Sequence, residues 1–335
     1  MEYRTLGKTG LTVSRLGFGG IPIQRIDREG TRELMQLLKE SGINYIDTAR
    51  GYTVSEEYLG YGLEGIREDF VLATKSMART AQAMAADIDT SLRNLRTDSI
   101  DLYQLHNPSL AQLEQVMAPG GALEALLEAR QAGKIRHIGI TAHSAQVFAR
   151  ALELDWVETV MFPYNIVENQ GQALIRQCAE KNVGFIAMKP LAGGAIEDAE
   201  LAMRFLAADP DVTVAIPGMA SPGELRQNLA AFSRTEALTP EELSRCQAIR
   251  DSLGTQFCRR CNYCAPCSQG ISIPNVFLFE GYLSRYGLAD WARSRYNAME
   301  KTASDCIGCC VCESRCPYNL PISKMMRAAA EKFGK

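Results

Sequence analysis

The stretch NYIDTARGY, residues 44–52, shows the pattern on which the fold prediction rests. It begins as a short run rich in apolar and β-branched residues and then changes to polar residues and a glycine, which is typical of a buried strand that ends in a loop. The segment before it, REGTRELMQLLKESG (28–42), places Leu34, Leu37 and Leu38 on one face of an amphipathic helix. Together the two segments form one helix–strand unit of an α/β protein.

This unit recurs through the first 250 residues. Short apolar runs alternate with stretches of helical periodicity, and parallel strands that are buried on both faces have this near-continuous apolar character. Eight such units predict a (β/α)8 TIM barrel. An open, doubly wound sheet is the alternative, but GFGGIP at the first strand does not supply the G-x-G-x-x-G turn typical of that fold. We predict strands at 15–20, 44–49, 70–75, 101–106, 135–141, 159–165, 184–190 and 212–218.

The chain is long enough for a large barrel and an additional domain. At 335 residues it exceeds what one small domain needs. The opening YRTLGKTGLTVS (3–14) predicts a small hairpin with KTG as its turn, placed at the floor of the barrel. Nine of the eleven cysteines lie at position 258 or later. We therefore predict a barrel over residues 1–250 and a second domain over residues 251–335.

Composition and charge exclude several classes of function. Apolar residues make up 46% and charged residues 22% of the chain, as in ordinary globular proteins. A net charge of −3 gives no electrostatic footprint for nucleic acid or for an acidic membrane surface. No apolar run reaches the roughly 18–20 residues of a membrane span, and the opening MEYRTLGKTG lacks the pattern of a signal peptide. We expect a cytoplasmic protein without nucleic-acid or membrane partners.

Four polar residues fall where three successive strands of the predicted barrel end. Asp47 and Tyr52 follow the second strand, Lys75 ends the third, and His106 ends the fourth. Active sites of such barrels lie at the carboxyl ends of the strands, so we expect these side chains to meet. A Tyr hydroxyl has an ordinary pKa of about 10, which a neighbouring ammonium lowers. Lys75 would make Tyr52 a usable acid, and Asp47 would orient Lys75. His106 would orient a substrate carbonyl or relay a proton.

The motifs that carry these residues resemble those of the aldo-keto reductases. YIDTARGY, LATKS and LYQLHNP match that family's Asp, Tyr, Lys and His segments in order, and RLGFGGIPI and IPGMASPGELRQNL resemble its cofactor-binding segments. The resemblance covers roughly residues 1–235 and implies a barrel that interconverts small aldehydes or ketones and alcohols by hydride transfer with NADP or NAD. It also implies cofactor contacts from Gly20, Ile21, Asp47, Thr141, Met188, Lys189, Pro190, Leu191, Gly218, Gln227 and Asn228.

The chain departs from the family around the nicotinamide ring. Where the family often has Ser, Asn, Gln and Tyr, this chain has Thr141, Ala142, Met161 and Met188. Thr141 keeps a hydroxyl for the carboxamide, and Met188 can cover the ring by dispersion and sulfur–aromatic contact. Ala142 and Met161 replace none of the side-chain hydrogen bonds, so we expect the ring to be held differently.

A second departure concerns the 2′-phosphate of NADP. Where the family often has a Lys and an Arg, this chain has Gly218 and Glu224. A carboxylate repels a phosphate, and bidentate Arg is what such groups prefer. Arg226 and Lys189 are the candidates that would compensate. The resemblance favours NADP and the local charge allows NAD, so both stay open.

The cysteines of the second domain are spaced as in iron–sulfur proteins. CRRCNYCAPC (258–267) contains three C-x2-C steps, and CIGCCVCESRCP (306–317) has the C-x2-C-x2-C-x3-C-P spacing of bacterial ferredoxins. Cytosolic thiols favour metal or redox chemistry over disulfides. A four-thiolate zinc site is the alternative, although zinc sites usually show two C-x2-C pairs separated by a longer gap. The candidate metal ligands are Cys258, Cys261, Cys264, Cys267, Cys306, Cys309, Cys312 and Cys316.

The two segments resemble ferredoxin-type modules that hold one or two 4Fe-4S clusters. In two-cluster ferredoxins the last cysteine of each run binds the other cluster, which implies that Cys316 joins the first run and Cys267 joins the second. The spacer contains LADWARSRYNAME (288–300), which is predicted to be helical, so the domain would be small and mostly helical. The cysteines outside this scheme, expected to be ordinary buried thiols, are Cys178, Cys246 and Cys310.

The role of the clusters stays open at this point. Hydride transfer moves two electrons together, an iron–sulfur cluster moves one, and no flavin site is recognisable between them. The clusters either stabilise the C-terminal domain and shape the substrate rim, or they relay electrons to an external redox partner. The leading hypothesis is an NAD(P)H-dependent aldo-keto reductase with such a domain. The alternatives are a redox-sensing protein whose barrel binds cofactor with little turnover, and an electron-transfer subunit.

Overall fold

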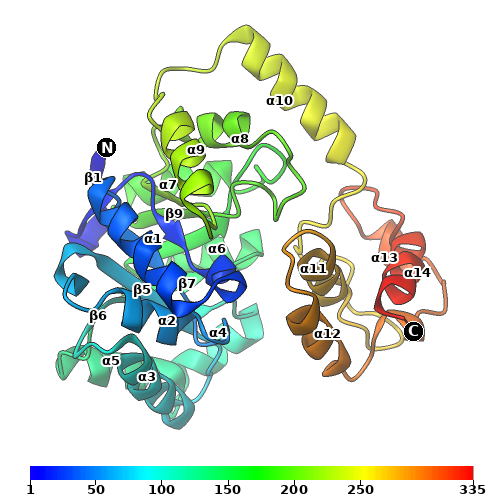
Figure 1. Cartoon of the computed structure of the whole chain (residues 1–335). Coiled ribbons are helices and arrows are strands. Elements are labelled where there is room, and N and C mark those ends of the chain that lie inside the picture. The colour runs from blue at the N-terminus through cyan, green and yellow to red at the C-terminus, as the bar shows by residue number, and fades with distance from the viewer. Residues whose placement is uncertain (335) are drawn as a thin grey trace. The chain divides into compact units, whose positions relative to one another are not determined.

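Residues 1–334 are described by a computed structural model, in which eight parallel strands form one sheet (Figure 1). The strands follow one another in chain order, and isolated bridges between Leu16 and Ala215 and between Gly19 and Gly218 join the last strand to the first. The sheet therefore closes into the predicted (β/α)8 barrel and not into an open sheet. The strands are β3 (Phe18–Gly19), β4 (Tyr45–Asp47), β5 (Val71–Ser76), β6 (Ile100–His106), β7 (Ile135–Thr141), β8 (Thr159–Pro163), β9 (Gly184–Met188) and β10 (Val214–Ile216).

Several observed strands are shorter than predicted at their carboxyl ends. The prediction extended the sixth barrel strand to residue 165 and the seventh to residue 190, whereas β8 ends at Pro163 and β9 at Met188. Tyr164 N still donates to Met188 O at 3.2 Å, and Lys189, the next residue, has a left-handed backbone with φ of 58°, which a strand does not adopt. The chain therefore leaves the sheet at these points and forms the loops at the carboxyl rim.

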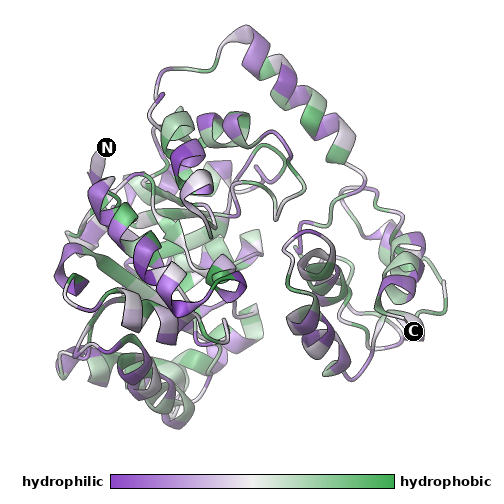
Figure 2. Cartoon of the chain, viewed as in Figure 1, coloured by the Kyte–Doolittle hydropathy of each residue, from purple (hydrophilic) through white to green (hydrophobic). Residues whose placement is uncertain are grey.

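Amphipathic helices connect the strands. In α1, Thr31, Leu34, Met35 and Leu38 are buried while the opposite face is exposed, and Figure 2 shows the corresponding alternation of purple and green along the helices. The helices that follow the strands are α1 (Arg28–Glu40), α2 (Ser55–Gly62), α3 (Ala81–Leu95), α4 (Leu110–Met117), α5 (Ala122–Gln131), α6 (Ala145–Ala151), α7 (Gln172–Glu180), α8 (Ala199–Ala207) and α9 (Pro222–Phe232), with 3-10 turns η2 (Ile21–Arg25) and η3 (Arg67–Asp69).

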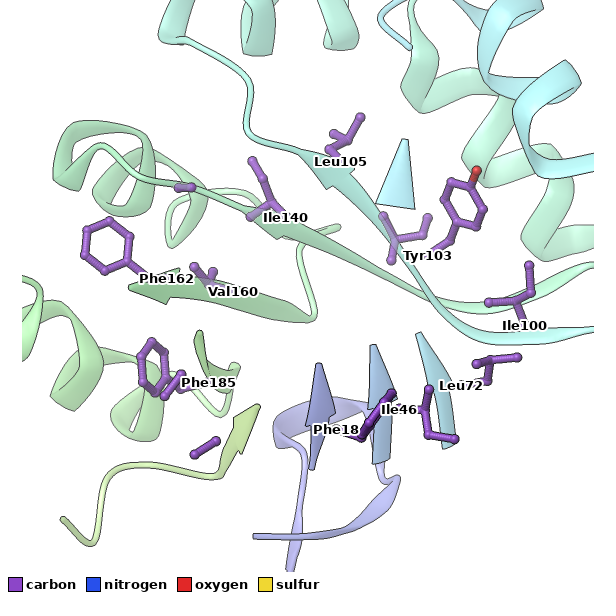
Figure 3. Close-up of a cluster of buried hydrophobic side chains, with 14 of the residues drawn as sticks. Phe18, Ile46, Leu72, Ile100, Tyr103, Leu105, Ile140, Val160, Phe162 and Phe185 are labelled. Carbon is purple, nitrogen blue, oxygen red and sulfur yellow. The ribbon is translucent and has the colours of Figure 1, made fainter. Parts of the chain in front are cut away.

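Alternate side chains of each strand point to opposite sides of the sheet. Figure 3 shows members of the set that packs against the helices, among them Phe18, Ile46, Leu72, Leu105 and Phe185. The set inside the barrel comprises Leu6, Val13, Tyr45, Ala73, Leu102, Met161, Ile186, Met188, Val214 and Ile216. Each fully buried side chain of this size contributes about 1.5–3 kcal/mol to stability. The alternation also decides that Asp47, one residue after Ile46, points inward.

The predicted N-terminal hairpin is present with a longer connection. Strands β1 (Tyr3–Thr5) and β2 (Thr12–Ser14) pair antiparallel, and a 3-10 turn, η1 (Gly7–Thr9), lies between them. Leu6 is fully buried among the interior side chains of the barrel, and Lys8 N donates to Asn182 O at 2.7 Å, directly before β9. The hairpin therefore closes the end of the barrel at which the strands begin.

The chain divides into two compact units, and the division does not follow the sequence alone. The predicted boundary at residue 250 lies inside α10 (Pro240–Leu253). The division into a domain over residues 1–250 and a domain over residues 251–335 stays a prediction. Two short segments that follow barrel strands pack with the C-terminal residues. The barrel unit comprises Met1–Asn165, Asn169–Pro190 and Asp198–Leu238. The cysteine-rich unit comprises Ile166–Glu168, Leu191–Glu197 and Thr239–Lys335.

The cysteine-rich unit has its own apolar core. The rings of Tyr296 and Phe333 stack with their centres 3.7 Å apart, and Ala303 N donates to Tyr296 Oη at 2.9 Å. The predicted helical spacer forms α12. The elements of the unit after α10 are α11 (Ile273–Ser284), α12 (Ala289–Asn297), η4 (Ala303–Asp305), α13 (Val311–Ser314) and α14 (Ile322–Phe333). Within residues 1–334, no helix is both long enough and apolar enough to cross a membrane.

Candidate functional site

Asp47 and Lys75 form a buried ion pair inside the barrel. Asp47 ends β4, Lys75 lies in the adjacent β5, and each residue is 2% exposed. Lys75 Nζ donates to Asp47 Oδ2 and, at 2.7 Å, to the carbonyl oxygen of Thr48. Gln104, the neighbour of Lys75 in β6, donates from Nε2 to Asp47 Oδ1 at 3.1 Å. Three adjacent strands thus hold the pair in place.

Burial acts on both charges of this pair. It lowers the pKa of Lys75 below the ordinary 10.5, and the attraction to Asp47 opposes this effect. Burial also raises the pKa of Asp47, against the opposing contributions of Lys75 and Gln104. Removal of one partner would leave an uncompensated buried charge, which costs about 3–5 kcal/mol. The carboxylate is therefore what keeps an ammonium in this position.

Tyr52 is held beside the ion pair by the loop between β4 and α2. Its N–H donates to Ala49 O at 3.0 Å, and its carbonyl accepts from Ser55 N at 2.9 Å. Lys75 Nζ lies 4.9 Å from the centre of the Tyr52 ring. The centre of the His106 ring lies 6.1 Å from that of Tyr52, with the two planes at 88°. The four predicted side chains thus meet at the carboxyl ends of β4, β5 and β6.

Two further polar residues of this region were not predicted. Gln104 is buried in a strand that looked apolar. It could have been predicted, because side chains two residues apart in a strand lie on the same face, and Gln104 is two residues before His106. Glu56 is 1% exposed and accepts from Thr74 Oγ1 and Ser91 Oγ, both at 2.8 Å. No sequence signal separates Glu56 from the exposed Glu57 next to it.

The buried Glu56 carboxylate also binds the loop that carries Tyr52. Arg50 Nη1 donates to Glu56 Oε2, and the backbone N–H of Arg50 donates to Lys75 O at 3.0 Å. Across the same loop, the hydroxyls of Thr48 and Ser55 lie 2.8 Å apart. These contacts fix the chain between the ion pair and the phenol.

The predicted cofactor residues follow the barrel strands. Gly20 N donates to Asp47 O at 2.8 Å, and a Cβ at Gly20 would lie 2.9 Å from the same oxygen, so no side chain fits there. Leu191 belongs to a segment of the cysteine-rich unit. In the barrel unit, Ile21 begins η2, Thr141 ends β7, Met188 ends β9 and is followed by Lys189 and Pro190, Gly218 follows β10, and Gln227 and Asn228 lie in α9.

The four residues that depart from the family pattern around the expected nicotinamide ring have different surroundings. Thr141 is 1% exposed, and its Oγ1 accepts from Asn107 N at 2.9 Å, which leaves the hydroxyl proton for another acceptor. Met161 and Met188 belong to the barrel interior. Ala142 belongs to the outer set that packs against the helices. Of the four, Thr141, Met161 and Met188 therefore face the inside of the barrel, and Ala142 faces the helices.

The region after β10 has little space for a side chain and carries a carboxylate. A Cβ at Gly218 would lie 2.6 Å from Cγ of Pro22, so a lysine cannot stand there without displacing η2. Glu224 Oε2 accepts from Ala220 N at 2.6 Å, and Oε1 lies 3.6 Å from Arg25 Nη2. The amino terminus of α9 is thus already occupied by a carboxylate of its own helix. Arg226, expected as a compensating cation, lines a different hollow with Glu2 and Arg15.

The cysteines surround two hollows in the cysteine-rich unit, grouped as the ferredoxin resemblance implied. The first hollow is lined by Cys258, Cys261, Cys264 and Cys316. The second is lined by Cys267, Cys306, Cys309, Cys310 and Cys312. Ile273 and Ile322 line both hollows, so the two are neighbours. Within residues 1–334, no three His, Cys, Asp or Glu side chains are arranged to hold a single metal ion.

Buried thiols such as these lose their protons when a positively charged metal centre binds them. Burial raises the pKa of Cys258 to about 11 and that of Cys264 to about 12. Thiolates are the ligands of iron–sulfur clusters, and metal binding supplies the charge that releases the protons.

The three cysteines outside the predicted ligand sets differ from one another. Cys178 and Cys246 are buried, as expected, and burial raises the pKa of Cys178 to about 12. The expectation was wrong for Cys310, which is exposed because it sits in a left-handed turn, with φ of 57°, at the start of α13.

Comparison with known proteins supports both parts of this description. The model of the aldo/keto reductase family matches residues 15–201, more than half of the chain, and the model of the 4Fe-4S dicluster domain matches residues 257–321. L-galactose dehydrogenase of Arabidopsis thaliana is 28% identical over 306 residues, which covers 74% of this chain and 94% of that protein.

Two solved structures are similar to the barrel. The holo form of aldo-keto reductase AKR11C1 from Bacillus halodurans has a TM-score of 0.64 at 27% identity and covers 74% of this chain and 96% of its own. A putative aldo-keto reductase from Pseudomonas aeruginosa, PA4992, has a TM-score of 0.63 at 30% identity and covers 69% of this chain and 95% of its own. The chain therefore belongs to the aldo/keto reductase family and carries a C-terminal 4Fe-4S dicluster domain.

Proposed function

We propose that this protein is an NAD(P)H-dependent reductase of small aldehydes or ketones that also catalyses the reverse oxidation of alcohols. The observation that carries the proposal is the Asp47–Lys75 ion pair beside Tyr52 and His106 at the carboxyl rim of the barrel. A buried cation next to a phenol is suited to proton donation, and an oxygen that is being reduced needs a proton.

The roles of the four residues follow from their positions. A bound nicotinamide dinucleotide supplies the hydride, which goes to the carbonyl carbon. Tyr52 donates its hydroxyl proton to the carbonyl oxygen, so that one hydride and one proton together give the alcohol. Lys75 stabilises the phenolate that remains, and Asp47 keeps the ammonium in place. His106 orients the carbonyl towards Tyr52.

The dinucleotide is assigned to the rim of the barrel. Gly20 and Ile21 would contact it at the start of η2. Thr141 would donate its hydroxyl proton to the carboxamide, and Met188 would contact the ring. Gln227 and Asn228 would bind the adenine edge. The carboxylate of Glu224 and the exclusion of a side chain at Gly218 favour NAD over NADP.

Each thiol set is proposed to hold one 4Fe-4S cluster. Cys258, Cys261, Cys264 and Cys316 would hold the first, and the second would have Cys267 as its distant ligand. The ligands of the second cluster in the later segment would be Cys306, Cys309 and Cys312. Cys310, which lines the same hollow, is outside the ferredoxin spacing.

Anaerobic preparation and isotope transfer test this function. Iron and sulfide should be present in the amounts that two 4Fe-4S clusters require. NADH or NADPH deuterated at the transferred position should then be oxidised by a panel of aldehydes and ketones, and the deuterium should appear on the carbinol carbon. Oxidation of the dinucleotide that needs no carbonyl and bleaches the clusters would contradict the proposal and favour an electron-transfer protein.

A further inference from the structure

A short segment after β8 is held by arginines of the cysteine-rich unit. Residues 166–168 are all buried, with exposed fractions of 0–3%, and they pack with that unit although β8 belongs to the barrel unit. The contacts run from Arg250 Nε to Ile166 O (2.8 Å), from Arg259 Nε to Val167 O (3.3 Å) and from Arg260 Nη2 to Glu168 Oε1 (2.6 Å). Three consecutive residues of the loop are therefore each bound by one guanidinium.

Arg260 links this segment to the first thiol set. It lies in the chain between Cys258 and Cys261, and its Nη1 donates to Cys258 O at 3.1 Å. Its side chain is 10% exposed and that of Glu168 is fully buried, so their ion pair is shielded from water. Arg260 also has a left-handed backbone with φ of 57°, which non-glycine residues adopt only where the surroundings impose it.

Arg259 makes a second link, to the other end of the same thiol set. Its guanidinium lies 3.8 Å from the centre of the Tyr318 ring, and Tyr318 follows Cys316 by two residues. Arg259 Nη1 also donates to Gly254 O at 3.1 Å. Both arginines therefore lie in the chain between two cysteines that line the first hollow.

Arg315, which lies between Cys312 of the second thiol set and Cys316 of the first, makes contacts of a different kind. Arg315 Nη1 donates to Pro266 O at 2.8 Å, and its other acceptor, Cys264 O, lies at 3.5 Å. These contacts join the two cysteine segments to each other. Arg315 therefore serves as a control for Arg260, because these contacts of its guanidinium lie within the cysteine segments and not at residues 166–168.

We propose that the cluster held by the first thiol set positions the segment at residues 166–168 through Arg259 and Arg260, which are positioning residues and not catalytic ones. The inference rests on the thiol assignment of the proposed function. A cluster fixes Cys258 and Cys261, so it fixes the two residues between them, and these hold the chain that continues β8. Loading of the first cluster thereby orders the three residues that continue the chain after β8 and Asn165.

Hydrogen exchange in the full-length chain tests the dependence on the cluster. We would compare the peptide covering residues 164–170 in the cluster-loaded protein, in the protein stripped by a chelator under anaerobic conditions, and in Cys258→Ser and Cys309→Ser variants with iron counted in each. Stripping and Cys258→Ser should speed exchange in this peptide by about tenfold or more, as expected for local opening. Cys309→Ser should leave it slow.

Three outcomes would overturn the proposal. The first is full iron content in Cys258→Ser, which would show that the thiol assignment is wrong. The second is loss of iron without faster exchange in residues 164–170, which would leave the assignment intact and remove the positioning role. The third is an equal effect of Cys309→Ser. Because exchange is measured without substrate, none of these results depends on whether the barrel reduces carbonyls.

Substitution of the arginine separates positioning from general stability. Arg260→Ala should speed exchange in residues 164–170 while iron content stays normal, and Arg260→Lys, which keeps a cation, should restore part of the protection. Arg315→Ala should leave the peptide protected. Protection that is unchanged in Arg260→Ala with full iron would contradict the role of Arg260.

Discussion

In the barrel, Asp47 and Lys75 stand on adjacent strands, and each charge finds its partner in the protein itself. In the cysteine-rich unit, the eight predicted ligand cysteines lie between helices or in the four-residue α13, and they line two hollows. The strands keep their geometry through the hydrogen bonds of a closed sheet, whereas the cysteine segments depend on what the hollows contain. The comparison indicates that the barrel site is preformed and that the thiol sites are completed by their ligand.

The largest effect is expected from removing the acid of the barrel site. Tyr52→Phe deletes the hydroxyl and leaves the ring beside Lys75, so turnover of aldehydes should fall by about 100- to 10,000-fold while the affinity for the dinucleotide stays close to wild type. Steady-state kinetics and cofactor titration measure the two quantities. Turnover within a few fold of wild type would show that Tyr52 is not the acid.

The next largest effect is expected from stripping the clusters. The cysteine-rich unit should then melt at least about 10 °C lower, because loss of a ligand removes folding free energy and about 1 kcal/mol corresponds to 4–8 °C in a domain of this size. The melting of the barrel should not change. Calorimetry and limited proteolysis of the full-length chain distinguish the two transitions.

Alkylation of the stripped protein supplies an internal control. Cysteines of the thiol sets should become reactive, while Cys178, whose pKa burial raises to about 12, should stay unmodified because the barrel remains closed. Modification of Cys178 together with the others would mean that the barrel also depends on the clusters.

A smaller effect is expected at the amino terminus of α9. Glu224→Arg replaces a repulsive carboxylate by a phosphate-binding group and should tighten NADPH binding about tenfold relative to NADH. Glu224→Gln keeps an acceptor for Ala220 N without the charge and should give an intermediate change. Titration of both dinucleotides measures the ratio. Wild-type protein that already prefers NADPH would contradict the preference for NAD.

The smallest effect is a shift of the pH profile. Burial lowers the pKa of Lys75. As the pH rises, the reduction rate should therefore begin to fall before pH 10.5 is reached, because the ammonium loses its proton. Asp47 raises the pKa of Lys75, and Asp47→Asn should therefore move this limb to lower pH, in addition to slowing the reaction. A limb that stays in place or moves to higher pH would exclude Lys75 as the group that titrates.

The strand–helix alternation, the four polar residues at the strand ends and the two cysteine runs could all be recognised from the sequence. These features depend on local periodicity and spacing, and closure of the barrel then brings together the ends of neighbouring strands. Gln104 lies within reach of the same reasoning, because it shares its face of the strand with His106. The burial of Glu56 could not be predicted in this way. Its partners are Thr74 of β5 and Ser91 and Asn94 of α3, which are brought together only by packing.

The sequence by itself determined which chemistry the chain carries: a phenol, an amine, an imidazole and a carboxylate at strand ends, and thiols at cluster spacing. Only the tertiary structure decided how these groups are surrounded. It showed that Pro22 excludes a side chain at Gly218 and that Glu168 pairs with Arg260 from a distant segment. The reason is physical: periodicity is a property of neighbouring residues, whereas steric exclusion and burial of charge depend on residues that meet only after folding.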